Sequence, residues 1–192
     1  RAPFDLQTGE SKQSAPKESY SAAVIDELNA QVEAGKPVVA INAAIPGMFD
    51  LERFKAAHAE RYFDVGIAEP DSVTTAVAMA AGGALPVLFE SSTFLQRAYD
   101  QLVHDVALNE YPIVMIVRGG TISSDSATHQ GTFDISYISS LPNIEYLAPT
   151  NVEEMISMLR WALKQNDTPV VIRQPEHELL HGTPSQDSYA TI

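Results

Sequence analysis

Short apolar runs alternate with helical patterns along most of the chain, and no other feature limits the possible folds as strongly. The first run is Val38 to Ile41, which ends at Asn42. Further runs cover residues 62–65, 85–89, 113–117, 144–147 and 170–172. Strands that are apolar at nearly every position are typical of parallel sheets covered on both faces. The sequence therefore predicts an α/β fold of three layers, with a mainly parallel sheet and helices on both faces.

Helical patterns fill the intervals between the runs. Tyr20, Val24, Leu28 and Val32 recur at four-residue spacing after a favourable N-cap at Ser19. Further helices are expected over 70–81, 93–108 and 133–139, and from a capping box formed by Thr150 and Glu153 to about residue 165. Residues 1–18 and 176–192 lack this periodicity. We therefore expect an N-terminal linker (1–18), one domain (19–175) and a C-terminal linker (176–192).

The composition limits the partners and the compartment. The chain has 12 Lys and Arg against 25 Asp and Glu, and its net charge of -13 argues against nucleic acid or an anionic membrane as partner. It has no Cys, which excludes disulfides, thiolate catalysis and cysteine zinc sites. No other metal-binding motif occurs, so we expect no metal ligands in this chain. No apolar stretch is long enough to span a bilayer and no signal peptide is visible, so a cytoplasmic location is expected.

Polar residues follow several of the apolar runs. Ligands of open α/β sheets bind beyond the carboxyl ends of the strands. Glu69 follows the second run, Arg118 follows the fourth, and Arg173 follows the last. From its position alone, Glu69 is more simply an N-cap residue before Pro70 that complements the helix dipole. His129 lies in a long Gly/Ser/Thr loop, where a solvated and a functional role are equally plausible.

Three motifs in order resemble one known family. Residues 61–69, RYFDVGIAE, resemble the transketolase-like pyrimidine-binding domain of the transketolase superfamily. Residues 92–101, STFLQRAYDQ, together with 104–107, HDVA, and 128–134, THQGTFD, are similar to the 1-deoxy-D-xylulose-5-phosphate synthase family in particular. The resemblance covers about residues 1–175.

This resemblance implies a specific chemistry. Members condense pyruvate with glyceraldehyde 3-phosphate, with loss of carbon dioxide, in isoprenoid and thiamine biosynthesis, and they use thiamine diphosphate and Mg²⁺. Glu69 would hydrogen-bond the aminopyrimidine ring and promote proton removal from the thiazolium ring, and Phe94 would pack on the pyrimidine. His129 would act in catalysis as well. The substrate-binding residues implied by the family are Arg97, Arg118, Asp125, His129 and Arg173.

The family's diphosphate and magnesium motif, Gly-Asp-Gly…Asn, is absent from this chain. We therefore expect a fragment that is inactive alone, with its site completed by a pyrophosphate-binding domain of the same or a partner chain, in a homodimer. Pro70, Ser91 and Gln174 depart from the family's usual residues, which leaves the acceptor substrate open. The alternatives are a diverged transketolase-like paralogue, a β-type subunit of a 2-oxo acid dehydrogenase, and a catalytically silent binding or assembly domain.

Overall fold

A six-stranded sheet forms the centre of the molecule. The computed structural model describes residues 4–9, 18–120, 128–176 and 178–183. The strand order is β2-β1-β3-β4-β6-β5, and all neighbouring strands are parallel. The predicted fold class is thus confirmed. The strands are β1 (Val38–Asn42), β2 (Tyr62–Asp64), β3 (Leu85–Ser91), β4 (Val114–Arg118), β5 (Glu145–Leu147) and β6 (Val170–Arg173).

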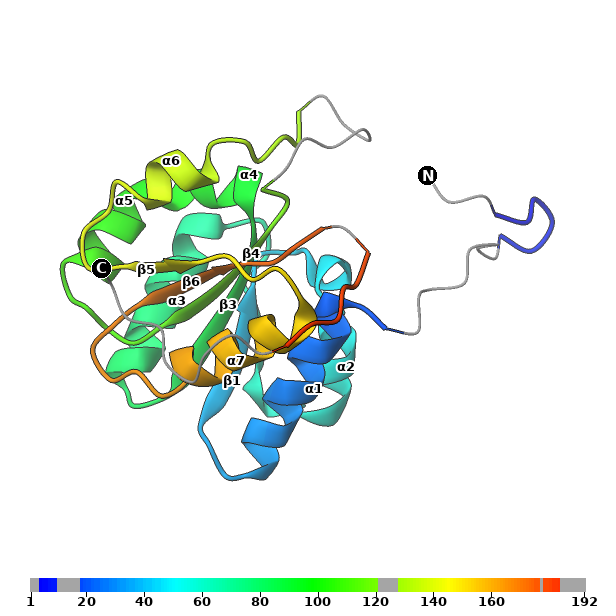
Figure 1. Ribbon diagram of the computed structural model, residues 1–192, viewed down its shortest axis with the longest axis horizontal. Coiled ribbons are helices and arrows are strands. Elements are labelled where there is room, and N and C mark those ends of the chain that lie inside the picture. Colours follow the sequence, from blue (N-terminus) through cyan, green and yellow to red (C-terminus); the bar gives the residue numbers. More distant parts are fainter. Residues whose placement is uncertain (1–3, 10–17, 121–127, 177, 184–192) are drawn as a thin grey trace.

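Helices cover both faces of this sheet (Figure 1). On one face lie α1 (Tyr20–Glu33), α2 (Leu51–Ala57) and α7 (Val152–Ala162). On the other lie α3 (Glu69–Ala81), α6 (Asp134–Ile138) and the helical segment 92–107. Two short 3₁₀ turns, η1 (Pro46–Met48) and η2 (Ala59–Arg61), flank α2. The sequence analysis did not predict α2 or these turns.

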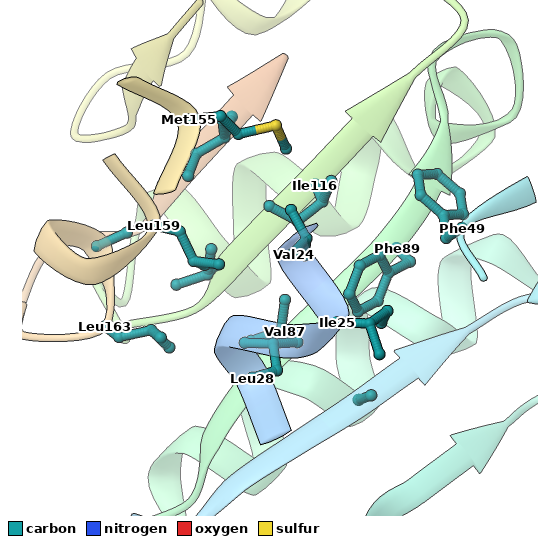
Figure 2. Packing of buried hydrophobic residues seen from close by; sticks show 14 of the residues in the cluster. Val24, Ile25, Leu28, Phe49, Val87, Phe89, Ile116, Met155, Leu159 and Leu163 are labelled. Carbon is teal, nitrogen blue, oxygen red and sulfur yellow. The ribbon is translucent and has the colours of Figure 1, made fainter. Parts of the chain in front are cut away.

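Alternate strand residues face two separate cores, as the pleat of a strand requires. Val87 and Phe89 of β3 pack with α1, α2 and α7, whereas Leu88 packs with α3 and the segment 92–107. Figure 2 shows the first core, in which Val24 and Leu28 of α1 lie near Val87. Because the central strands β1, β3, β4 and β6 are covered on both faces, they need apolar residues at most positions, and this explains their continuous runs in the sequence.

The ends of two helices test the predicted caps. The α1 cap is confirmed, because Ser19 Oγ accepts a hydrogen bond of 3.0 Å from Ala22 N. The capping box predicted for Thr150 and Glu153 is wrong by one residue. Asn151 is the N-cap of α7, since its Oδ1 accepts from Glu154 N at 2.9 Å. Asn caps a helix at least as well as Thr, so the residue nearer to the helix takes this position.

The helix expected over residues 93–108 changes pitch along its length. It consists of α4 (Ser92–Leu95), η3 (Gln96–Ala98), α5 (Tyr99–Gln101) and η4 (Leu102–Ala107), the last being a π-helix. The buried residues Leu95, Ala98, Leu102 and Val106 are spaced by three, four and four positions. These four residues pack in one cluster with α3 and the sheet, although the pitch of the backbone changes along the segment. Such π-type turns occur often at functional sites.

Residues 178–183 lie against the domain. Leu180 N donates to the Tyr20 hydroxyl at 3.3 Å, and Leu180 O accepts from Val152 N at 3.0 Å. These bonds connect the segment to the starts of α1 and α7. The domain and linker boundaries given above remain predictions. None of the described helices has the length and apolar character needed to cross a membrane.

Candidate active site

A tight turn after β2 places Glu69 at the start of α3. Asp64 Oδ1 accepts hydrogen bonds from Gly66 N at 2.9 Å and from Ala44 N at 3.0 Å. Gly66 has a φ of 74°, a conformation that favours glycine. The N-cap of α3 is Ala68, so the N-cap position predicted for Glu69 is wrong by one residue. Glu69 is the first helical residue and Pro70 is the second. Proline is tolerated there, because backbone N–H groups in the first turn of a helix have no helical partner.

Four of the predicted site residues form a chain of contacts, in which each side chain touches the next. Glu69 is buried, and its Oε1 accepts a hydrogen bond of 2.5 Å from Arg97 Nη1. The guanidinium of Arg97 lies 5.1 Å from the centroid of the Phe94 ring, as a cation–π contact. The Phe94 ring in turn meets the His129 ring edge to face at 5.4 Å. The structure therefore brings Glu69, Arg97, Phe94 and His129 together.

Gly131 allows the loop that carries His129 to approach the sheet. Its carbonyl oxygen accepts from Ser92 Oγ at 3.0 Å. A Cβ atom at position 131 would overlap Gly119 O and the Ser92 side chain. The glycine of the THQG motif is thus required by close approach. Next to it, Thr128 Oγ1 and His129 Nδ1 lie 2.9 Å apart.

Glu90 lies close enough to Glu69 to be affected by its charge, and it was not among the predicted site residues. It is fully buried near the end of β3, and its Oε1 lies 3.2 Å from Ser72 Oγ. Burial raises the pKa of Glu90 to about 8, and the charge of Glu69 contributes to the increase. A signal was present in the sequence, since a glutamate directly follows a run that predicts a fully buried strand. The structure extends β3 to Ser91 and so includes Glu90 in the strand.

Arg173 is engaged in a buried ion pair. Its Nε donates to Asp134 Oδ2 at 2.7 Å, and the Tyr146 hydroxyl donates to the same oxygen at 2.9 Å. Asp134 is almost completely buried. Burial and the negative charge of Asp134 raise the pKa of Tyr146, so the phenol keeps its proton. Asp134 was not predicted as a partner of Arg173, because α6 lies far from β6 in the sequence.

Arg118 lies on the opposite face of the sheet from Arg173. Its Nη1 donates to Met48 O beside α2, and its Nε donates to Glu176 Oε1 at 3.2 Å. It lines a pocket of about 710 Å³ together with Ser21, Met48, Gln174, Glu176 and Glu178. The two arginines expected to bind substrate phosphate thus lie at the ends of neighbouring strands, and their guanidinium groups bond partners on opposite faces of the sheet. Asp125 lies outside the described residues.

The described residues include no group of three or more His, Asp or Glu side chains suited to a metal ion. The features that fit an organic ligand are the buried carboxylate of Glu69 and the neighbouring half-buried Phe94 ring. A carboxylate can accept or return a proton at a heterocyclic nitrogen, and an aromatic ring can pack against a planar group. These two side chains suit an aminopyrimidine.

Comparisons of sequence identify the relatives of this chain. Residues 17–180 match the family described as "Transketolase, pyrimidine binding domain". A 1-deoxy-D-xylulose-5-phosphate synthase of Clostridium botulinum is 47% identical over 160 residues, which are 83% of this chain and 26% of the relative. The synthase 2 of Jannaschia sp. is 43% identical over 179 residues, or 92% of this chain and 28% of the relative. The chain thus spans little more than a quarter of the length of these relatives.

Two solved structures share the fold. A split-gene transketolase, described as an inactive β4 tetramer, superposes with a TM-score of 0.69 and 22% identity, over 81% of this chain and 50% of that one. A transketolase mutant from Pichia stipitis in complex with xylulose 5-phosphate gives a TM-score of 0.70 and 18% identity. That match covers 83% of this chain and 26% of the Pichia chain.

Proposed function

We propose that this chain supplies the pyrimidine half of a thiamine-diphosphate site, because it belongs to the transketolase pyrimidine-binding domain family. The reaction would be the condensation of pyruvate with glyceraldehyde 3-phosphate to 1-deoxy-D-xylulose 5-phosphate, with loss of carbon dioxide. The relatives named above are synthases of this compound. The observation that carries the proposal is the buried Glu69 carboxylate paired with Arg97 beside the Phe94 ring.

Glu69 would hold the aminopyrimidine by its second carboxylate oxygen. Arg97 bonds Oε1, which fixes the plane of the carboxylate and leaves Oε2 for a ring nitrogen. Burial keeps water away from this oxygen, so that a proton moves between carboxyl and ring rather than to solvent. Phe94 would pack on the ring, and His129, at the edge of Phe94, would handle the substrate. When bound, thiamine diphosphate supplies the electron sink for decarboxylation.

The remaining parts of the site would come from outside this chain. We infer that Mg²⁺ and the diphosphate bind to a pyrophosphate-binding domain, within a homodimer. Arg118 and Arg173 each already bond a carboxylate, Glu176 and Asp134 respectively. A guanidinium has five N–H donors, so each arginine keeps donors for a substrate phosphate. Retention of Glu69 together with Arg97 favours a catalytic domain over a silent binding domain.

The proposal is tested by Glu69→Gln in an active enzyme that contains this chain. Gln keeps the size of the side chain but cannot exchange a proton, so turnover should fall at least about 100-fold, the usual range for loss of a general acid or base. The matched control is Asp71→Asn, which removes an exposed carboxylate from the same first turn of α3. If Glu69 only complements the helix dipole, both variants will lower stability slightly and leave turnover unchanged.

A second test uses the chain by itself. Because half of the cofactor site would be missing, we expect weak thiamine-diphosphate binding by isothermal titration calorimetry and no synthase activity. Tight binding that depends on Mg²⁺ would show that the chain holds the diphosphate itself. That result would contradict the proposed division of the site between two domains.

A further inference from the structure

A second buried carboxyl group lies beneath the start of α3. The Glu90 side chain is 0% exposed, and its Oε2 has no hydrogen-bond partner within the described part of the chain. A buried carboxylate without full hydrogen bonding is much less stable than a neutral carboxylic acid in the same place. A hydrogen bond from the Ser91 backbone favours the ionised form, but burial outweighs it and raises the pKa, so the surroundings of Glu90 favour a bound proton.

The hydrogen bonds of Ser72 point to the same conclusion. Ser72 Oγ lies 2.7 Å from Glu69 O and 3.2 Å from Glu90 Oε1. A hydroxyl has one hydrogen, and the nearer neighbour is a carbonyl that can only accept. The contact with Glu90 then needs a hydrogen from Glu90 itself. In this arrangement Glu90 donates to Ser72, and Ser72 donates to the first residue of α3.

The charged and titratable groups around Glu90 are Glu69 of α3, Arg97 of η3 and Tyr137 of α6. Burial raises the pKa of Tyr137, so this phenol stays neutral. Arg97 is already paired with Glu69, and its side chain is 55% exposed to solvent. If Glu90 lost its proton, a second negative charge would compete with Glu69 for one partly solvated guanidinium.

We propose that Glu90 is a positioning residue, which holds the first turn of α3 through Ser72 while it is neutral and disrupts the Glu69–Arg97 pair when it ionises. The inference rests on the proposed function of Glu69. It adds a requirement that the resemblance does not imply, namely that the acid next to the cofactor carboxylate must keep its proton. The enzyme should therefore lose activity at alkaline pH through the chain's own residue.

The test is the pH dependence of kcat/KM in an active enzyme that contains this chain. With a Glu90 pKa of about 8, wild-type kcat/KM should fall about tenfold between pH 7 and pH 9. Glu90→Gln and Glu90→Leu should both lose this decrease. The Gln variant should have the higher kcat of the two, because its amide can donate to Ser72 and leucine cannot. Glu33→Gln, at an exposed position of α1, should keep the wild-type profile.

A second measurement uses this chain and needs no activity. The Glu90 carboxyl carbon in ¹³C-labelled protein, assigned by its loss in either variant, should titrate with a midpoint near 8 by NMR. A midpoint near the ordinary glutamate value, or an unchanged alkaline decrease in Glu90→Gln, would overturn the inference. Normal turnover in Glu69→Gln would instead overturn the proposed function and leave the Glu90 titration as it stands.

Discussion

Replacement of Arg173 by leucine should destabilise the fold strongly. The Asp134 side chain is 0% exposed, and Arg173, at 27% exposure, is its cationic partner at 2.7 Å. Removal of one partner of a buried ion pair costs about 3–5 kcal/mol, because the remaining charge is left unpaired in a medium of low dielectric constant. Since Arg173 is partly solvated, we expect a loss of about 3 kcal/mol in the free energy of unfolding. For a chain of this size that lowers Tm by about 6–12 °C.

The assay is equilibrium unfolding in urea, followed by the fluorescence of Trp161, the single tryptophan. The midpoint should fall with an unchanged m value. The control is Arg53→Leu, because Arg53 pairs with Asp26 on the surface, with side chains 46% and 62% exposed. Its loss should stay below about 1 kcal/mol. The double variant Asp134→Asn/Arg173→Leu should recover part of the stability, which measures the coupling between the two residues.

A loss below about 1 kcal/mol in Arg173→Leu would refute this reasoning. It would mean that Asp134 is stable without its cationic partner, either neutral or hydrated. Arg173 would then have no large structural role. Its predicted role as a phosphate ligand is compatible with either result and needs a measurement of activity.

Three further predictions concern the site and the residues near the C-terminus. Arg97→Ala in an active enzyme should lower kcat more than it raises KM, because it removes the partner that orients Glu69. Steady-state kinetics measure both constants, and wild-type values of kcat and KM in the variant would contradict this prediction. Gly131→Ala should misplace the His129 loop and lower Tm, since a Cβ would overlap Gly119 O; Gly47→Ala, with open space at Cβ, is the control in a thermal melt. The pKa of His181 should lie above the ordinary histidine value, because the ring bonds Glu153. This bond should stabilise the fold fully at pH values below the ordinary pKa. The stabilisation should be lost as the pH rises through the raised pKa. Glu153→Gln should lower the NMR midpoint of His181, and Glu18, 3.6 Å from Nε2, should keep part of the increase.

The layers of the fold follow from local patterns in the sequence. The central strands β1, β3, β4 and β6 are almost entirely buried, so they appear as apolar runs, and α1 carries both its stripe and its cap within residues 19–33. The cap of α7 was misplaced by one position because Thr150 and Asn151 are adjacent and both are good N-cap residues. The pitch changes in 92–107 were not predictable, because they depend on contacts with the sheet.

The candidate site residues that lie in recognisable motifs were predictable from the sequence. Glu69, Phe94, Arg97 and His129 occur in recognisable segments, and the structure brings them together. The partners of the arginines were not predictable, because Asp134 and Glu176 meet them only through the folded topology. Glu90 was missed because its significance depends on complete burial, which a sequence indicates only indirectly.

The all-parallel sheet also determines when the site forms during folding. Parallel neighbours cannot be joined by a hairpin, so each pairing needs a crossover of a dozen residues or more. The Glu69–Arg97 bond spans 28 positions, and the bond between the Ser92 hydroxyl and Gly131, beside His129, spans 39. Contacts of such separation form after the chain has lost most of its loop entropy, which makes folding slow. We therefore expect the contacts that join Glu69 to Arg97 and Ser92 to Gly131 to form late in folding, after the local helices.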